Sequence, residues 1–278
     1  MENWRERYDD LVSGARQPAD CSVAELFELA SCLAVNGDFA AKYAVYLMIL
    51  EHPLAGKGGQ DRVLVYHADM QRRNGHAGLA LALLERIGRP EDCAALLDWL
   101  QAMGQCCVMQ ERYEAAIAYQ RELIGLLDDT TLVDLRFYYL QTLAHLKMLA
   151  NQPDDEVRTL LAQMDGLLAF PDFPAAKRSY SQESYLCLLG RWYGLKNLSI
   201  DAVGVLLQAY RSPTSVRQQA NTAMLLLYYQ IKSGGQARWF GDVANFYRDN
   251  KAALQPTDVV QYRRYYDLVE QHLADQPS

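Results

Sequence analysis

Apolar residues recur along almost the whole chain at spacings of three and four, and strict alternation of apolar and polar residues is hardly seen. Spacings of three and four place apolar side chains on one face of an α-helix, whereas alternation would indicate β-strands. Short polar stretches interrupt the pattern, namely NGD at 36–38, GKGGQ at 56–60, RNGH at 73–76, NQPDD at 151–155 and KSGGQ at 232–236. Because Gly, Asn and Pro favour turns, the sequence predicts an all-α fold with loops at these stretches.

The predicted helices are about three to four turns long and are joined by short loops. Ser22 followed by Glu25 has the spacing of a capping box, in which each side chain accepts a hydrogen bond from a backbone N–H at the start of a helix. Short loops force consecutive helices to run antiparallel. We therefore expect a stack of helix hairpins in series, about five to seven of them.

A repeated unit is clearest at residues 183–214, ESYLCLLGRWYGLKNLSIDAVGVLLQAYRSPT. Its apolar and small residues fit the pattern W-x2-L-G-x2-Y-x8-A-x3-F-x2-A, in which small residues lie where two helices cross. The fitting residues are Leu186, Leu189, Gly190, Tyr193, Ala202, Leu206 and Ala209, and Pro213 closes the unit. The unit resembles the tetratricopeptide (TPR) repeat, and the resemblance implies a superhelical α-solenoid of stacked hairpins.

Three further units, 23–56, 61–92 and 97–128, fit the same pattern with departures. In 97–128 the positions are taken by Leu100, Met103, Gly104, Cys107, Ala116, Gln120 and Leu123, with Gln120 where an aromatic residue or Leu is expected. In 61–92 the fitting residues include Leu64, Ala68, Ala80 and Leu84, whereas His67 and Gln71 depart from the pattern; in 23–56, Lys42 replaces a small Ala. Residues 131–170 and 216–250 are predicted as helix pairs that fit only with insertions.

The ends of the chain are predicted to cap the stack. Residues 256–274 form an amphipathic pattern with Val259, Tyr262, Tyr266 and Val269 or Leu273 on one face, which suits a C-terminal capping helix. The N-terminal segment would cap the other end through Trp4, Tyr8 and Leu11. Since no stretch has the composition of a linker, residues 1–278 are expected to form one domain, and the Pro-containing stretch 170–179 is either a loop or a hinge.

Composition excludes several classes of function. The net charge is −7 and the pI about 5.3, without a run of Lys or Arg, which argues against binding to nucleic acid. The first twenty residues are too polar for a signal peptide, and no stretch approaches the ~18 uninterrupted apolar residues of a membrane span. We expect a cytoplasmic protein.

The six cysteines do not form a C-x-x-C pair and lie in periodic apolar segments, as expected for reduced thiols. Adjacent Cys106 and Cys107 raise the question of reactivity. Cys107 takes the position of a packing Tyr in the repeat, and a buried Cys behaves as a small apolar residue. We interpret both as packing residues.

Motifs of catalysis and of metal or cofactor binding are absent from the sequence. The histidines His52, His67, His76, His145 and His272 are dispersed, and AGKGGQ at 55–60 does not match the phosphate-binding sequence G-x4-G-K-[ST]. No G-x-S-x-G or G-x-G-x-x-G sequence is found. We expect neither enzymatic activity nor a metal or cofactor, although a catalytic site assembled only in three dimensions stays open.

The TPR resemblance implies that an extended peptide or a helix of a partner protein binds in a groove lined by the first helix of each hairpin. Residues between the packing positions are expected to face this groove: Arg62, Asp69, Arg72, Arg73, Gln101, Gln105, Met109, Cys187 and Arg191. The alternative is that they are ordinary solvated residues. The four arginines would form a positive strip suited to an acidic partner.

The set of Lys and Asn with which some TPR proteins bind a C-terminal carboxylate is not present, because the matching positions read Phe27, Ser31, Tyr66, Asp98 and Ala102. The predicted function is a non-enzymatic adaptor, scaffold or chaperone-like protein. A sensory or regulatory module that binds a peptide or small ligand is the alternative, followed by an enzyme with a site in the groove. In the tyrosine pairs 138–139, 228–229 and 265–266, one ring is expected to face outward and offer a contact.

Overall fold

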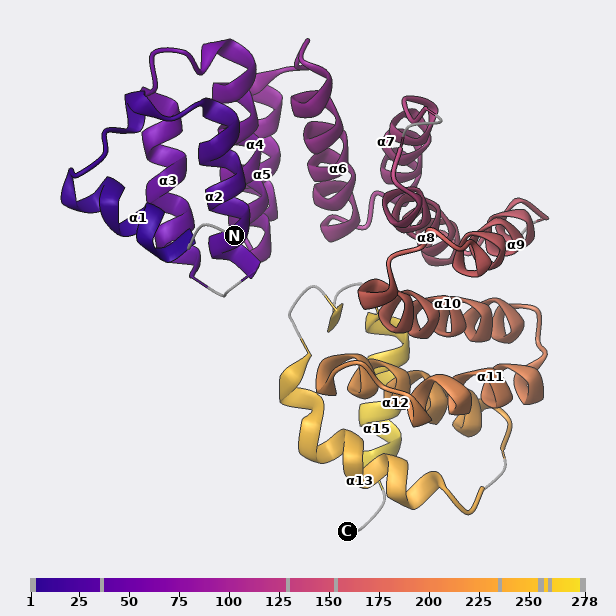
Figure 1. The fold of residues 1–278 in the computed structure, drawn as a ribbon. Helices are drawn as coiled ribbons and strands as arrows, with labels where there is room; N and C mark the ends of the chain where they lie inside the picture. The colour runs from indigo at the N-terminus through magenta and orange to yellow at the C-terminus, as the bar shows by residue number, and fades with distance from the viewer. Residues whose placement is uncertain are drawn as a thin grey trace. The chain divides into compact units, whose positions relative to one another are not determined.

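The computed structural model describes residues 4–35, 38–128, 131–152, 155–234, 237–254, 258–259 and 262–275. Within these ranges the secondary structure consists of α-helices and two short 3-10 helices, without a β-strand (Figure 1). The prediction of an all-α fold is confirmed. Contacts divide the chain into two compact units, unit 1 (Met1–Met103) and unit 2 (Gly104–Ser278). Whether the two form one domain stays a prediction, and each is described by itself.

Unit 1 contains two helix hairpins and the first part of a further helix. The elements are α1 (Trp4–Ser13), η1 (Pro18–Asp20), α2 (Val23–Val35), α3 (Phe39–Glu51), α4 (Gly56–Arg73), α5 (Ala77–Ile87) and the N-terminal part of α6 (Cys93–Met109). The core lies between α2 and α3, where Leu26, Leu33 and Ile49 are fully buried. Leu11 is buried against the same cluster, and Trp4 packs beside it. The predicted N-terminal cap is therefore confirmed.

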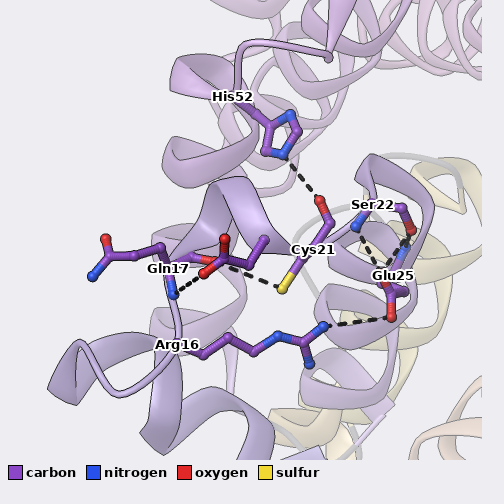
Figure 2. A network of polar contacts seen from close by, with 7 residues as sticks. Arg16, Gln17, Cys21, Ser22, Glu25 and His52 are labelled. Carbon is purple, nitrogen blue, oxygen red and sulfur yellow. Dashed lines mark hydrogen bonds and ion pairs between the residues drawn. The ribbon is translucent and has the colours of Figure 1, made fainter.

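The predicted capping box at the start of α2 is also confirmed (Figure 2). The Ser22 N–H donates to Glu25 Oε2 at 2.7 Å, and the Glu25 N–H donates to Ser22 Oγ at 3.2 Å. Buried His52 connects the loop after α3 to this region. Its Nδ1 accepts from the Leu54 N–H at 3.1 Å, so its Nε2 carries the proton that it donates to the Cys21 carbonyl oxygen at 3.0 Å.

Unit 2 continues the series of helices. Its elements are the end of α6, then α7 (Tyr113–Gly125), α8 (Val133–Leu149), α9 (Asp155–Ala169), α10 (Ala175–Leu195), α11 (Ser199–Arg211), α12 (Val216–Lys232), α13 (Phe240–Asn250), η2 (Lys251–Ala253) and α15 (Arg263–Ala274). Consecutive helices from α7 to α13 pack against each other, α8 packs on both α9 and α10, and α15 packs on α12. One apolar cluster centres on α8 and α9, and a second on α12.

The repeat pattern is fulfilled most closely by the hairpin of α10 and α11. Ala202, Leu206 and Ala209 are fully buried. A Cβ atom placed on Gly190 would lie 2.6 Å from Leu206 Cγ and 3.3 Å from the Ala202 carbonyl oxygen, so the two helices cross closely here, as predicted. A Cβ on Gly194 would lie 2.0 Å from Tyr229 Cε1, a close approach that the sequence analysis did not identify.

The hairpin of α6 and α7 confirms the burial predicted for the adjacent cysteines, because Cys106 is 0% and Cys107 1% exposed. Gln120, the poor fit to the pattern, is also buried, and its side-chain amide donates to the Tyr139 carbonyl oxygen at 3.0 Å. The repeat pattern predicts a close helix crossing at Gly104, and this prediction is wrong. A Cβ there would lie 3.8 Å from its nearest neighbours on α7, an ordinary contact, so the crossing admits a Cβ atom.

Three local predictions need correction. Leu64 is 39% exposed, because Val63 and Val65 on either side of it take the buried positions of α4. The first helix of the 183–214 unit begins earlier, at Ala175. The C-terminal helix is shorter than predicted: Asp258 and Val259 are helical, but a turn falls at Tyr262 and α15 begins at Arg263, whereas 256–257 and 260–261 lie outside the described residues.

The tyrosine pairs follow the prediction only in part. Tyr138 is 43% exposed beside buried Tyr139, but Tyr228 and Tyr229 are both buried, because α12 has packing partners on more than one side.

The stretch 170–179 contains a loop at 170–174 followed by the start of α10. Phe173 is buried there and makes an edge contact with Phe137 at 5.7 Å, so packing fixes the loop; a hinge role stays a prediction.

Candidate functional site

Arg62, predicted to contact a partner, is at the centre of a cluster in unit 1 that joins α2, α4 and α6. Its Nε donates to Asp98 Oδ2 at 2.8 Å, and its guanidinium lies 4.8 Å from the ring centre of Phe27. A second cation–π contact, of 5.8 Å, joins it to Tyr66 on its own helix. Burial would lower the pKa of Arg62, but the hydrogen bond with Asp98 raises it, so the guanidinium is held charged and in a fixed direction.

Aromatic rings extend this cluster from α4 to α3. Tyr46 and Tyr66 are stacked, with ring centres 5.1 Å apart and an interplanar angle of 3°. The Lys42 ammonium lies over both rings, at 5.3 and 5.5 Å from their centres. The repeat pattern expects a small Ala at position 42. Lys42 is accommodated there because its aliphatic chain lies along the aromatic rings. Burial, followed by the nearby charge of Arg73, lowers the pKa of Lys42.

Asp69 binds two of the predicted contact residues. Arg72 Nη2 donates to its Oδ1 at 2.8 Å and Arg73 Nε to its Oδ2 at 2.7 Å. The side chain of Arg72 is only 8% exposed, whereas that of Arg73 is 71% exposed. The expectation that Arg72 projects into an open groove is therefore wrong, since this residue is packed against its own helix to neutralise a largely buried carboxylate. Burial would raise the pKa of Asp69, but Arg72 and Arg73 lower it.

Together these residues define the unit 1 cluster, which is formed by side chains of α2, α3, α4 and α6: Phe27, Lys42, Tyr46, Arg62, Tyr66, Asp69, Arg72, Arg73 and Asp98. It contains four cations and two carboxylates, and so carries two excess positive charges in a chain of net charge −7. Its aromatic faces and its cations are within contact distance of each other. Such a surface suits an acidic segment with apolar or aromatic side chains.

Gln101, Gln105 and Met109 follow one another at spacings of four along α6, and all three are half-buried. Gln101 belongs to unit 1, whereas Gln105 and Met109 belong to unit 2. Their role in partner binding stays a prediction.

Arg191 lies in unit 2 on α10 and is 0% exposed. The expectation that it joins a positive strip on an open surface is therefore wrong. The aromatic rings of Tyr262 and Tyr265 cover its guanidinium at 5.0 and 5.5 Å, and its Nη1 donates to His145 Nδ1 at 2.6 Å. The sequence pattern places Arg191 on the expected face of its helix but gives no sign of the residues that cover it. Cys187, one turn earlier on α10, contacts the Thr222 hydroxyl at 3.2 Å.

A hollow that the sequence analysis did not identify opens in unit 2 over α7, α8 and α9. Its volume is about 360 Å³, and its lining consists of Arg121, Ile124, Leu140, Leu143, Glu156, Thr159, Leu160 and Gln163. Glu156 accepts a hydrogen bond from Arg121 at 2.7 Å and another from the buried Lys147. The hydrogen bond from Lys147, opposed by burial and supported by Arg121, lowers the pKa of Glu156. The charged side chains Arg121, Lys147 and Glu156 therefore pair with one another.

No group of three or more His, Cys, Asp or Glu side chains in the described ranges is placed to hold a metal ion. Among the helices that the structure describes, none combines the length and the apolar character needed to cross a bilayer.

The likeness to TPR proteins is one of fold, and the series of buried helix hairpins described above confirms it. No protein-family model matches the chain, and no curated protein matches its sequence. Among solved structures, a protein from Podosopora anserina described as a kinesin light chain with nearly identical TPR-like repeats is 17% identical, with a TM-score of 0.49 over 70% of this chain and 96% of that chain. A point variant of the same protein is 15% identical, with a TM-score of 0.49 over 75% of this chain and 98% of that chain.

Proposed function

We propose that the protein is a non-enzymatic protein-binding module, an adaptor, scaffold or chaperone-like protein, and that the unit 1 cluster binds an acidic segment of its partner. The observation that supports this proposal is the joining of aromatic rings and cations from four helices on one partly exposed surface. Arg and aromatic side chains are enriched among the residues that dominate the energy of protein interfaces.

The internal contacts of the cluster favour binding by limiting the entropy lost when a partner docks. Arg62 is held by Asp98 and by the ring of Phe27, so its guanidinium does not need to be ordered again. Arg73 shares Asp69 with Arg72 and has a mostly exposed side chain, so it is the cation that a carboxylate of the partner reaches most easily. Long-range attraction by the excess positive charge would also speed the encounter.

Arg73→Glu tests the proposal, with Arg86→Glu as the matched control. Both arginines are exposed on helices of unit 1, and both substitutions change the charge equally, but Arg86 lies outside the cluster. Arg72 is left intact, because a Glu at this buried position would face Asp69 and destabilise the helix. Proteins captured from the native cell by the wild type and by each variant are compared by quantitative mass spectrometry.

We expect Arg73→Glu to weaken capture of a specific partner at least about tenfold, which corresponds to about 1.4 kcal/mol, while Arg86→Glu retains it. The helical circular dichroism of both variants should equal that of the wild type, since one exposed ion pair contributes only about 0 to 1 kcal/mol. A well-folded Arg73→Glu variant that captures the same partners at wild-type levels would exclude the unit 1 cluster as the binding surface.

A further inference from the structure

The chain's own C-terminal segment lies across several helices of unit 2 and contacts each of them through a different side chain. Asp258 accepts two hydrogen bonds from Arg217 of α12, at 2.8 Å from Nε and 2.7 Å from Nη2. The Tyr262 ring packs edge-on against His145 of α8 at 5.5 Å and covers Arg191 of α10. This segment thus occupies a face that α8, α10 and α12 form together.

Further contacts fix the end of the segment. Arg263 Nη1 donates to Glu111 Oε1, in the turn between α6 and α7, at 3.0 Å, and both side chains are more than half exposed. Tyr265 packs against Tyr228 of α12, with ring centres 4.5 Å apart. Polar contacts at Asp258 and Arg263 therefore flank a central aromatic contact. An exposed ion pair such as that of Arg263 is readily exchanged for contacts with water.

The centre of this face holds the fully buried guanidinium of Arg191. In the described part of the chain no carboxylate pairs with Arg191, and its Nε and Nη2 have no hydrogen-bond partner. Burial would lower its pKa, but Tyr265, Tyr262 and Tyr229 raise it, so the guanidinium remains charged. Burial would raise the pKa of Tyr265, but the charge of Arg191 and a hydrogen bond with it lower this pKa. A buried guanidinium with two free donors is suited to the planar, two-oxygen geometry of a carboxylate.

We propose that the face of α8, α10 and α12 in unit 2 is a second binding site, for an acidic peptide segment of a partner protein whose carboxylate pairs with Arg191 in place of Tyr262. Arg217 binds a second carboxylate of the partner, as it binds Asp258 within the chain. The chain's own segment covers the site until the partner displaces it. This surface is independent of the unit 1 cluster.

The spacing of the two acidic residues follows from the segment that is already in place. The Tyr262 N–H donates to the Asp258 carbonyl oxygen at 2.9 Å, which is one helical turn. Side chains four residues apart in a helical turn point to the same side. The partner segment therefore carries two acidic residues four positions apart, one for Arg217 and one for Arg191.

A comparison of Tyr262→Glu with Tyr262→Gln in the full chain tests the central contact. The two side chains have the same shape and differ in charge, so the difference between the variants reports the interaction of a carboxylate with Arg191. We expect the Glu variant to melt about 3 °C or more above the Gln variant. A Glu variant that melts at or below the Gln variant shows that the site does not accept a carboxylate, and overturns the proposal.

Displacement is tested with a labelled peptide of residues 256–268 that carries Tyr262→Glu, and with the matching Tyr262→Gln peptide as control. Fluorescence anisotropy measures binding to the full chain with Asp258→Ala and Arg263→Ala, which lack the two polar contacts of the covering segment. We expect the Glu peptide to bind about tenfold more tightly than the Gln peptide, and more tightly to this variant than to the wild type.

Equal binding of the two peptides, or no binding of either, would show that the covering segment is a fixed part of the fold and overturn the proposed partner site. Arg217→Ala provides an internal check, because its side chain is 42% exposed and its loss should weaken peptide binding without unfolding unit 2. Neither experiment involves Arg73, so a negative result here leaves the proposal for unit 1 unaffected.

Discussion

The close crossing of α10 and α11 makes a quantitative prediction for two glycines of one hairpin. Gly190 faces Leu206 at a distance that does not admit a Cβ atom, since the added carbon would lie 2.6 Å from Leu206 Cγ. Gly204, in the interior of α11, has no atom within 4 Å of its added Cβ. Ala at either position gains the same helix propensity, so a comparison of the two substitutions isolates the packing cost.

Replacing Gly by Ala in a helix interior stabilises by about 0.8 to 1 kcal/mol. Gly204→Ala should show this gain almost in full. At Gly190 the added methyl group overpacks the crossing, at a cost of about 1 to 3 kcal/mol, so Gly190→Ala should be neutral or destabilising by up to about 2 kcal/mol. The difference between the two variants is then about 1 to 3 kcal/mol in the free energy of unfolding.

Urea denaturation followed by circular dichroism at 222 nm gives these free energies. A double-mutant cycle with Leu206→Ala supplies the control, because this change removes the atoms that the added methyl group would meet. Leu206→Ala alone is destabilising, since Leu206 is fully buried, but adding Gly190→Ala to it should then cost much less than it does in the wild type. If Gly190→Ala stabilises the protein as much as Gly204→Ala does, the crossing is not close and our repeat alignment in this hairpin is wrong.

Three further predictions address the cysteines, an ion pair and a helix cap. A thiol reagent should modify the exposed Cys93 rapidly in the native protein, whereas the buried Cys107 should react only after unfolding; rapid native modification of Cys107 would contradict its packing role. Asp69→Asn should destabilise by about 1 to 3 kcal/mol at neutral pH, because it leaves Arg72 without its carboxylate. Since folding lowers the pKa of Asp69, the wild type should lose this advantage as the pH falls below about 4, so equal losses in both proteins between pH 7 and pH 3 would contradict the assignment. Ser22→Ala should cost about 0.5 to 2 kcal/mol in urea denaturation, and an unchanged midpoint would show that the capping box is dispensable.

The fold could be predicted from the sequence to the level of helices and hairpins, because both depend on short-range signals. Turn residues and the capping box mark the helix ends, and spacings of three and four mark the buried faces. Contacts between residues far apart in sequence could not be predicted. The clearest example is Tyr229, which was expected to alternate in exposure with its neighbour but is buried against Gly194 and Tyr265 from other helices.

The candidate site could be predicted only as a set of positions on helix faces. Helical spacing places Arg62, Asp69 and Arg73 toward the same side, and the structure confirms that α4 carries them. The pattern does not show that Arg62 pairs with Asp98 on α6, or that the misfit Lys42 on α3 lies over aromatic rings. These pairings arise from the packing of one hairpin on the next, which depends on side chains distributed over the whole unit.

Arg191 shows why a residue on a predicted binding face can be fully buried. Its position between the packing residues of α10 predicts a surface residue, but Tyr262 and Tyr265 cover its guanidinium and His145 of α8 contacts it. Burying an ion costs several kcal/mol, and a cation–π contact of a desolvated guanidinium recovers about 2 kcal/mol. Tyr262 and Tyr265 therefore offset part of that cost, while two donors of the guanidinium stay unsatisfied. A carboxylate that displaces Tyr262 would satisfy them, so the same contacts that close the site also leave an energetic advantage for an acidic ligand.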